Sequence, residues 1–460
     1  MKTPALNMSQ KIALDKAKEK YANAYRKRTP KSHALFDAAC KYMPGGDSRT
    51  TTWFFPYASW IDKADGYRII DVDGNECIDF NNCYTALVLG HGNAKIKAAI
   101  REQLEKGPMT LATAAPDMVR WAEILCQRVA SIDKIRFTNS GTEATMLAAR
   151  LARAFTGKEK LLMIEGGFHG KYDSTVYPSS RKGLPKFVQD TTLTVPYNDK
   201  EAAEKIITEN KDQLAAMILE GMMGSGGYVP ARSDYVKFVR EVTAANNVLL
   251  ILDEVMTFRF DYGGMQHIFG IKPDLTTLGK VIGGNTPAGA CGGREDIMQQ
   301  LTQNASVSPE VPTVYWSGTF NANPVTAVAG IAALEQITAE EIARINGLGE
   351  SLAKGIRSVF ARLSIKGYVT GFGSLRRLHF SPVPVVDYKT WQGANKDILV
   401  LLHLALLERG IYRDERCMFN ISTPMTENEI EIAVKAVEDS LTELKPHIEE
   451  IWPDLVGKVE

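Results

Sequence analysis

The stretch Pro273-Asp-Leu-Thr-Thr-Leu-Gly-Lys280-Val-Ile-Gly-Gly284 is the most informative part of this chain. Its lysine stands between apolar and glycine residues, a tight setting that disfavours a free ammonium because desolvation lowers the pKa of lysine. Lys280 lies 27 positions beyond Asp253, which closes the apolar run 248–252. An apolar run of this length that ends in a carboxylate is typical of a buried parallel strand. We therefore expect a buried amine downstream of an acid at a strand end.

Around this stretch, short apolar runs alternate with helical periodicity from about residue 86 to 324. The clearest helical pattern covers 142–155, and the apolar runs cover 135–137, 161–164, 216–219 and 248–252. This alternation is typical of βα units and predicts a mostly parallel sheet covered by helices on both faces. Ligands bind at the carboxyl ends of the strands in such sheets.

The two flanks have a different texture. Short strand-like pieces occur at 67–70 and 77–80, and the C-terminal part predicts helices followed by small strands near 375–380 and 419–422. We expect both flanks to form one smaller α+β domain. The predicted organisation is an N-terminal segment with part of the small domain (1–85), a large domain (86–324) and the C-terminal part of the small domain (325–460).

The length, charge balance and cysteine spacing of the chain argue against several classes of protein. The 460 residues are too many for one hydrophobic core. Lys+Arg and Asp+Glu both number 54, and this balance argues against nucleic acid and anionic membranes as partners. The six cysteines have no C-x-x-C spacing, so we expect neither a disulfide framework nor a metal site. No segment resembles a signal peptide or a bilayer span, and we expect a cytoplasmic protein.

Lys280 and Asp253 together are the minimal equipment for pyridoxal 5'-phosphate (PLP) chemistry. The lysine can form a Schiff base with the aldehyde, while the carboxylate keeps the pyridine nitrogen protonated so that the ring accepts electrons. The ordinary alternative for a lone lysine is a surface residue. An apolar strand followed by Asp-Glu also occurs in nucleotide hydrolases, but the G-x-x-x-x-G-K-[ST] loop that they require is missing.

A phosphate site is predicted in Ile135-Arg-Phe-Thr-Asn-Ser140-Gly141-Thr142-Glu143, which runs from a strand through small residues into a helix. Free N–H groups at a helix N-terminus favour an anion, and the two hydroxyl side chains add donors. Taken alone, this pattern is more often a simple N-cap. Its combination with the acid and the lysine favours phosphate binding.

With these residues in view, the chain resembles the class III, fold type I PLP-dependent aminotransferases. The most similar branch holds glutamate-1-semialdehyde aminomutase and the β-amino-acid (β-phenylalanine) aminotransferases, and the resemblance covers roughly residues 35–440. This resemblance implies a large domain with a mostly parallel seven-stranded sheet and a smaller α+β domain from both chain ends. The motifs that carry it are Met43-Pro-Gly-Gly46, Asp71-Val-Asp-Gly74, Leu89-Gly-His-Gly92, Asn139-Ser-Gly-Thr-Glu-Ala144, Phe168-His-Gly170, Asp253-Glu-Val-Met-Thr257, Pro273-Asp-Leu-Thr-Thr-Leu-Gly-Lys280 and Ser317-Gly-Thr-Phe-Asn-Ala-Asn-Pro324.

The resemblance also implies roles. Lys280 would be the Schiff-base lysine, Asp253 the partner of the pyridinium nitrogen, and these two are the implied catalytic residues. Phe168 and Val255 would sandwich the ring, although the family usually has Tyr where this chain has Phe168. Thr319 would reach the phosphate of the neighbouring subunit, because the family's active sites are shared in a homodimer. The implied cofactor-binding residues are Ser140, Gly141, Thr142, Phe168, His169, Glu220, Asp253, Val255, Lys280 and Thr319.

Three residues are expected to bind substrate. Arg49 matches a carboxylate-binding position of the aminomutase and of the β-amino-acid enzymes, and Arg416 matches a second arginine that the latter use for the oxo acid. A guanidinium binds a carboxylate through two parallel charge-assisted bonds. Arg413 and Arg376 are the alternatives to Arg416. Trp53 is the third; it belongs to the aromatic cluster Trp53-Phe54-Phe55, which is expected either to accept an apolar or aromatic substrate side chain or to be core of the small domain.

The function predicted from these residues is an aminotransferase. It would move an amino group from an amino acid, a β-amino acid with an aromatic or apolar side chain, to an α-oxo acid such as 2-oxoglutarate or pyruvate. The partners would be these small molecules and a second copy of the chain. The alternative is an aminomutase or racemase of the glutamate-1-semialdehyde aminomutase type. A more remote alternative is a catalytically silent interaction protein on the same scaffold.

Overall fold

The computed structural model describes residues 6–176, 182–302 and 314–457. The chain divides into two compact units: unit 1 comprises residues 1–93 and 344–460, and unit 2 comprises residues 94–343. The second boundary falls inside helix α13 (Ala339–Leu363). The domain limits expected from the sequence (1–85, 86–324 and 325–460) stay a prediction, because a division into compact units does not show which segments fold independently.

Unit 2 is built on a seven-stranded sheet with the order β4-β10-β9-β8-β7-β5-β6. The strands β6, β5, β7, β8 and β9 pair in parallel, whereas β10 is antiparallel to both β9 and β4. This mostly parallel sheet confirms the predicted fold class. The strands are β4 (Lys134–Thr138), β5 (Lys160–Ile164), β6 (Thr192–Val195), β7 (Leu214–Glu220), β8 (Leu249–Asp253), β9 (Leu275–Gly279) and β10 (Gly289–Gly293).

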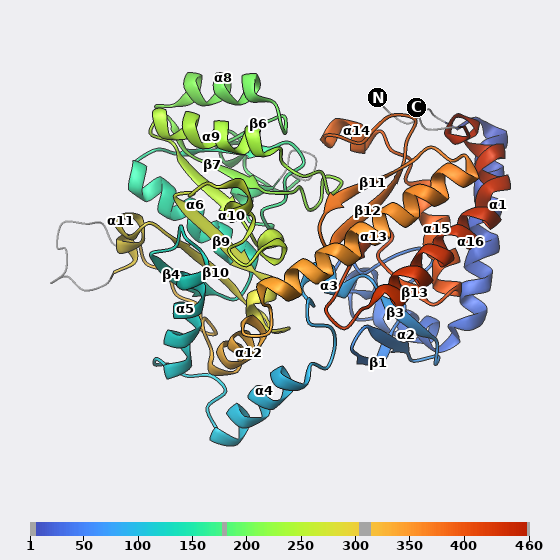
Figure 1. The fold of residues 1–460 in the computed structure, drawn as a ribbon, viewed down its shortest axis with the longest axis horizontal. Coiled ribbons are helices and arrows are strands. Elements are labelled where there is room, and N and C mark those ends of the chain that lie inside the picture. The colour runs from blue at the N-terminus through green and yellow to red at the C-terminus, as the bar shows by residue number, and fades with distance from the viewer. Residues whose placement is uncertain (1–5, 177–181, 303–313, 458–460) are drawn as a thin grey trace. The chain divides into compact units, whose positions relative to one another are not determined.

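Helices lie beside the sheet of unit 2. Helix α6 packs against β7, β9 and β10, whereas α9 packs against β8 and α8 against β6 (Figure 1). Because β7 and β8 are buried along their whole length, their residues form continuous apolar runs up to the closing acids, rather than alternating patterns. Strand β9 is also buried, but it contains Thr276 and Thr277. The helices are α4 (Ala94–Lys106), α5 (Pro116–Arg128), α6 (Gly141–Thr156), α7 (Lys186–Gln189), α8 (Lys200–Asn210), α9 (Ser233–Ala245), α10 (Met265–Phe269), α11 (Glu295–Met298) and α12 (Pro324–Leu334).

Strand β10 has no strand-like sequence, and the sequence did not predict it. Its residues are Gly-Ala-Cys-Gly-Gly, which lack the β-branched and aromatic side chains that mark strands. The glycines are required by close backbone contacts: a Cβ at Gly289 would lie 2.1 Å from the carbonyl oxygen of Ser140, and one at Gly293 would lie 2.4 Å from that of Asp274. Packing therefore selects these residues against their local propensity.

Unit 1 contains both ends of the chain. Strand β13 pairs in parallel with β3, so a C-terminal strand completes an N-terminal sheet of order β1-β2-β3-β13. A second, antiparallel sheet has the order β11-β12-β14. The strands are β1 (Ile61–Asp65), β2 (Arg68–Asp71), β3 (Glu76–Asp79), β11 (Gly367–Phe372), β12 (Leu375–Phe380), β13 (Ile411–Tyr412) and β14 (Met418–Asn420).

The helices of unit 1 come from both ends of the chain. Helix α1 packs against α15 and α16. In the residues that the structure describes, no helix is long and apolar enough to cross a bilayer. Besides α13, the helices of this unit are α1 (Met8–Arg28), α2 (Pro30–Cys40), α3 (Asn82–Thr85), α14 (Tyr388–Gln392), α15 (Asp397–Glu408) and α16 (Glu427–Ile451).

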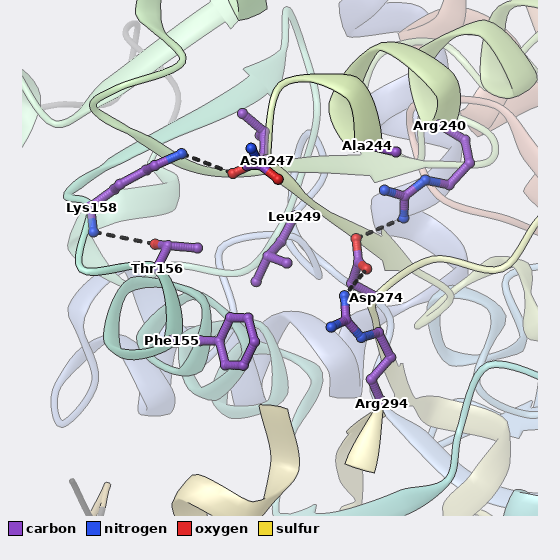
Figure 2. A pocket seen from close by; sticks show the side chains of 10 residues that line it. Phe155, Thr156, Lys158, Arg240, Ala244, Asn247, Leu249, Asp274 and Arg294 are labelled. Carbon is purple, nitrogen blue, oxygen red and sulfur yellow. Dashed lines mark hydrogen bonds and ion pairs between the residues drawn. The ribbon is translucent and has the colours of Figure 1, made fainter. Parts of the chain in front are cut away.

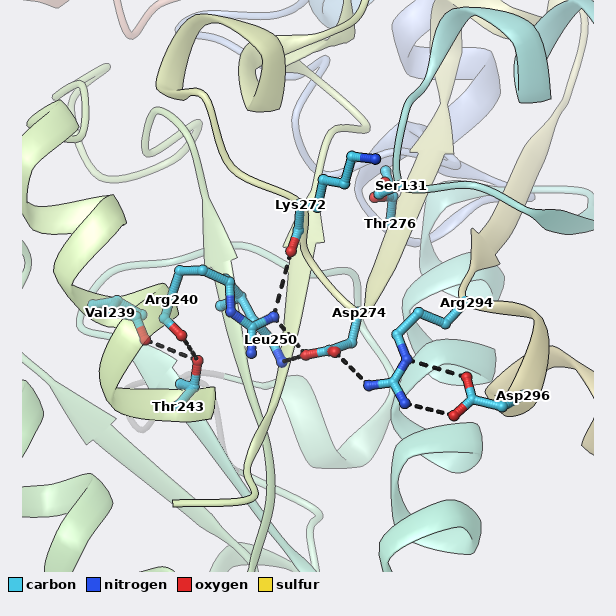
Figure 3. Close-up of polar contacts among 10 residues, drawn as sticks. All are labelled: Ser131, Val239, Arg240, Thr243, Leu250, Lys272, Asp274, Thr276, Arg294 and Asp296. Carbon is cyan, nitrogen blue, oxygen red and sulfur yellow. Dashed lines mark hydrogen bonds and ion pairs between the residues drawn. The ribbon is translucent and has the colours of Figure 1, made fainter. Parts of the chain in front are cut away.

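Asp274 ties together the elements at the amino end of β9. Its Oδ2 accepts hydrogen bonds from Arg240 Nη1 at 2.7 Å and from the Leu250 amide at 2.8 Å, and its Oδ1 accepts one from Arg294 Nη1 at 2.8 Å (Figure 3). A cavity of about 400 Å³ lies beside this cluster (Figure 2). In it, Lys158 Nζ donates to the carbonyl oxygen of Asn247, and both arginines bond to Asp274. These mutual bonds indicate a structural role.

Replacing Asp274 should destabilise the protein. Burial alone would raise the pKa of Asp274, but the bonds from Leu250, Arg240 and Arg294 hold it below its ordinary value. We expect Asp274→Asn to lower the free energy of unfolding by about 3 kcal/mol, because two cations lose their shared partner. The contribution of Asp274 should be present at neutral pH and be lost as pH falls through its lowered pKa. Urea denaturation at several pH values measures both effects.

A matched control is Asp296→Asn. Asp296 also pairs with Arg294, at 2.5 Å, but both side chains are about half exposed. Its loss should cost less than about 1 kcal/mol. Equal effects of the two substitutions would contradict a special role for Asp274.

Candidate active site

The carboxyl ends of neighbouring strands bring Asp253 and Lys280 together in unit 2. Asp253 is the last residue of β8, and Lys280 follows directly after β9. The two strands are paired in parallel, with Asp253 opposite Thr277. Lys280 has a left-handed backbone (φ 51°) that turns the chain out of β9. Its side chain is half-buried in unit 2, so the expectation of a buried amine was too strong.

Glu220 and His169 join Asp253 at this edge of the sheet. Glu220 closes β7 and stands opposite Asp253 in the register of β7 and β8. His169 follows β5, and its Nδ1 lies 2.8 Å from Asp253 Oδ2. An ionised carboxylate only accepts hydrogen bonds, so this ring nitrogen is the donor. Burial alone would lower the pKa of His169, but the bond and charge of Asp253, with the charge of Glu220, raise it.

The N-terminus of α6 lies against the strand ends. A Cβ at Gly141 would stand 2.7 Å from Val255 Cγ1, and one at Gly279 would stand 3.2 Å from the same atom and 3.4 Å from the Cα of Gly141. The predicted phosphate-binding turn, the exit of β8 and the residue before Lys280 are therefore immediate neighbours. Glycine is needed at position 141 because any side chain would collide with Val255.

The hydroxyl groups of this turn have distinct environments. Ser140 is the N-cap of α6, and its Oγ accepts a hydrogen bond from the Glu143 amide at 3.2 Å. Thr142 Oγ1 would lie 2.6 Å from a Cβ on Gly170, so the loop after β5 approaches it closely. The capping reading of the sequence is therefore correct for Ser140, and it coexists with the helix N-terminus expected to hold phosphate.

Phe168 and Thr319 are both accessible in unit 2. The Phe168 side chain is 44% exposed, and its backbone amide donates to Glu220 Oε2 at 2.8 Å. Thr319 lines a cavity of about 1130 Å³. Near it, the Asn139 side chain donates to Asn321 Oδ1 at 2.7 Å, which ties the Thr319 segment to the residue before Ser140. The ring-stacking and phosphate roles of Phe168 and Thr319 stay predictions.

Within unit 1, the two predicted substrate arginines meet at Tyr84. The guanidinium carbon of Arg49 lies 5.4 Å from the Tyr84 ring centre, and that of Arg416 lies 5.1 Å from it. Arg416 Nε also donates to Asp414 at 2.6 Å. The Tyr84 hydroxyl donates to the carbonyl oxygen of Thr51. Sequence reasoning missed Tyr84, because a single tyrosine outside any motif carries no signal.

The alternatives to Arg416 are structural. Arg413 is fully buried and donates to the carbonyl oxygen of Asp414 at 2.7 Å. Arg376 is buried too, donates to the carbonyl oxygens of Gly371 and Gly373, and pairs with Glu350. Both side chains are therefore engaged within the protein, and the substrate role of Arg416 stays a prediction.

The aromatic run Trp53-Phe54-Phe55 divides between surface and core. Trp53 is 45% exposed, whereas Phe54 is buried. The ring of Phe54 packs edge-on against Tyr25 and His403, at centroid distances of 5.7 and 4.3 Å. The core interpretation is therefore correct for Phe54, and a substrate contact of Trp53 stays a prediction.

Comparison with known proteins identifies the family. The model of the class-III aminotransferases matches residues 54–396, and the chain belongs to this family. It is 37% identical to a glutamate-1-semialdehyde 2,1-aminomutase of Methanosphaera stadtmanae, over 90% of this chain and 99% of that protein. The corresponding aminomutase of Methanocaldococcus jannaschii is 36% identical, over 89% of this chain and 97% of that protein.

Solved structures give the same family. An omega-transaminase from Sphaerobacter thermophilus has a TM-score of 0.85 at 36% identity, over 90% of this chain and 98% of that chain. A β-phenylalanine aminotransferase from Variovorax paradoxus has a TM-score of 0.89 at 32% identity, over 97% of this chain and 100% of that chain. The chain is therefore a PLP-dependent fold type I enzyme, as the sequence predicted.

The residues at the strand ends fit PLP. A helix N-terminus suits a phosphate, and Asp253, only 4% exposed, suits a protonated ring nitrogen. His169 Nδ1 holds that carboxylate in place. When bound, PLP supplies an aldehyde for an amine and an electron-accepting ring.

Gly141→Ala tests the fit at the helix N-terminus. The new methyl group would push against Val255 and move the turn, so we expect the dissociation constant for PLP to rise roughly tenfold to a hundredfold. Titration of the cofactor-free chain with PLP, followed by absorbance, measures this. Gly347→Ala in α13 is the control, because its Cβ would meet nothing within 4 Å. Unchanged affinity of the Gly141 variant would contradict the assignment.

Proposed function

We propose that this enzyme moves an amino group between two positions of one carboxylate-bearing substrate, as an aminomutase of the glutamate-1-semialdehyde type. The observation that carries this proposal is the similarity to aminomutases across almost their full length, at 34–37% identity. The sequence predicted a β-amino-acid aminotransferase, which is a more specific function than membership of the class-III family. The named relatives support the alternative, an aminomutase, better.

In this proposal Lys280 and Asp253 are the catalytic residues. Lys280 Nζ holds the cofactor and then carries a proton to and from the amino-bearing carbon of the substrate. Asp253 Oδ2 keeps the ring nitrogen protonated, and His169 orients that oxygen. Gly141 and Thr142 bind the phosphate with the helix N-terminus, and Phe168 with Val255 encloses the ring.

Arg49 binds the substrate carboxylate in this proposal. Its side chain is exposed, and its Nη1 lies 3.7 Å from Cys83 Sγ, a weak partner that leaves the guanidinium able to form two bonds with a carboxylate. The ring of Tyr84 offers its face to the guanidinium from one side. Because one face of the Arg49 guanidinium lies over the Tyr84 ring, its edge can bind the substrate carboxylate. This pairing of two planar groups orients the substrate.

Transamination between two substrates is the second candidate. It is favoured by the placement of Arg49 and Arg416 about one tyrosine ring, because a transaminase must hold the carboxylates of a donor and of an acceptor in turn. The solved transaminases at 36% and 32% identity also favour it. A β-amino acid as donor and 2-oxoglutarate or pyruvate as acceptor belong to this candidate.

A homodimer is part of the proposal. Large apolar side chains are exposed on unit 2, several of them around or beside the 1130 Å³ cavity that Thr319 lines. Exposed apolar surface of this kind marks an interaction site. A second copy of the chain would cover it and receive Thr319 at its phosphate. These side chains are Met109, Leu111, Val119, Tyr315 and Phe320.

Product analysis separates the two candidates. With glutamate 1-semialdehyde and no oxo acid, an aminomutase should produce the positional isomer over many turnovers, whereas a transaminase should stop after about one turnover per site. Borohydride reduction of the holoenzyme should place the cofactor mass on the Lys280 peptide, and Lys272→Arg serves as a surface control. If isomer is missing and amino transfer from β-phenylalanine needs 2-oxoglutarate or pyruvate, the second candidate replaces the first.

Arginine-to-lysine substitutions test the carboxylate contacts. Arg49→Lys keeps the charge but loses the paired hydrogen bonds, so we expect KM for the amino substrate to rise roughly tenfold to a hundredfold. Under the aminomutase proposal Arg416→Lys should change KM by less than about threefold, whereas the second candidate expects a KM effect on the oxo acid alone. Steady-state kinetics with each substrate varied distinguishes these results. Wild-type KM in the Arg49 variant would refute the contact.

A further inference from the structure

Three titratable side chains are buried together behind the strand ends of unit 2. Glu220, His169 and Asp253 are 5%, 1% and 4% exposed. A charge at such a position is costly unless another charge or hydrogen bonds compensate it. Two acids and one base share the site, so their protonation states depend on one another.

The carboxyl group of Glu220 is held by two backbone amides. Phe168 N donates to Oε2 at 2.8 Å, and Gly224 N donates to Oε1 at 2.9 Å. Tyr197 donates to the backbone carbonyl of Glu220 at 2.7 Å, not to its carboxyl. Among the described residues no cationic side chain pairs with Glu220. Two neutral donors alone compensate a buried negative charge incompletely.

His169 bonds to Asp253 and lies close to Glu220. Its Nδ1 bonds to Asp253, while its Nε2 is buried and has no hydrogen-bond partner in the described part of the chain. A Cβ at Gly167 would lie 3.1 Å from this Nε2 and 3.5 Å from Glu220 Oε2. The Nε2 edge of His169 and the carboxyl of Glu220 therefore both lie next to Gly167. Because glycine has no side chain, the space between these two groups and Gly167 stays open.

We propose that Glu220 is a positioning residue that holds a proton until the pyridinium ring binds at Asp253 and then releases this proton to solvent. The inference rests on the proposed function, because it needs the ring nitrogen at Asp253. The proton leaves the Glu220 carboxyl as the cation arrives, and no bond forms between Glu220 and the cofactor. The resulting carboxylate then stabilises the charged His169 and, through it, the ionised Asp253.

The electrostatics of the cluster support this exchange. Burial raises the pKa of Glu220 to about 7, with Asp253 adding to the rise and with His169 and the amides of Phe168 and Gly224 opposing it. The remaining titratable neighbour, Tyr197, stays neutral because burial raises the pKa of its hydroxyl. A new cation nearby lowers the pKa of Glu220. Because binding releases a proton, affinity should rise as pH increases through about 7.

The test uses the full chain freed of cofactor and the probe 4-deoxypyridoxine 5'-phosphate, which lacks the aldehyde and cannot react with Lys280. Calorimetry in buffers of different ionisation enthalpy counts the protons released near pH 7. The wild type should release roughly half to one proton more than Glu220→Gln. Its dissociation constant should fall by up to about tenfold more between pH 6 and pH 8 than that of the variant.

Two variants serve as controls. Tyr197→Phe removes a hydroxyl whose hydrogen bond goes to the backbone carbonyl of Glu220 and not to its carboxyl, so its proton count should equal that of the wild type. Glu220→Asp keeps a carboxyl group at this position. It should therefore release a proton when the probe binds, whereas Glu220→Gln should not. If Glu220→Gln does not fold, difference infrared spectroscopy on the wild type replaces it, and the band of a protonated carboxyl should disappear when the probe binds.

Each outcome has a distinct meaning. Equal proton counts in the wild type and Glu220→Gln, or an infrared carboxyl band that is unchanged by the probe, overturn the inference and leave the proposed function intact. A wild-type chain that does not bind the probe refutes the placement of the ring at Asp253, and the proposed function fails with the inference. Proton release that disappears only in Glu220→Gln supports it.

Discussion

The parallel pairing of β7, β8 and β9 is the constraint on which the candidate site depends. Side chains at the carboxyl ends of parallel strands share one edge of the sheet, and the register places Glu220 opposite Asp253 and Asp253 opposite Thr277. Lys280 follows three residues after Thr277. Hydrogen bonds between the strands thus hold an acid, a second acid and an amine in a fixed spatial order, although they are dispersed over 61 residues of sequence.

This arrangement is stabilised by burial, and burial also controls its chemistry. The strands that carry Glu220 and Asp253 are covered along their whole length, so both carboxyl groups depend on nearby donors rather than on water. For Asp253 the donors are His169 and the Val255 amide, at 2.8 and 3.0 Å. For Glu220 they are two amides. The two acids of one edge therefore differ in their partners, since a histidine side chain bonds to one and only backbone amides bond to the carboxyl of the other among the described residues.

In unit 1, too, residues that are far apart in the sequence meet at one place. Arg49 and Arg416 come from opposite ends of the chain, and a third residue, Tyr84, brings them together. The pairing of β3 with β13 connects these ends. An enzyme that recognises carboxylates benefits from arginines held on an aromatic face, because the cation is fixed without an acid that would compete with the substrate. Arg416 departs partly from this pattern, since Asp414 also binds it.

The sequence by itself determined the cofactor, PLP, and the fold class. Apolar runs ending in Asp253 and Glu220, a lysine in a glycine-rich turn and a helix-start pattern at Ser140 are local features, and each was recognisable without coordinates. Only the tertiary structure decided which residues meet. The strand β10, the contact of Gly141 with Val255, the position of the Tyr84 ring between two arginines and the bond of His169 to Asp253 arise from contacts between segments far apart in the chain. Such contacts leave no periodic pattern, because close approach selects a glycine or a single side chain at one position rather than a repeated residue type.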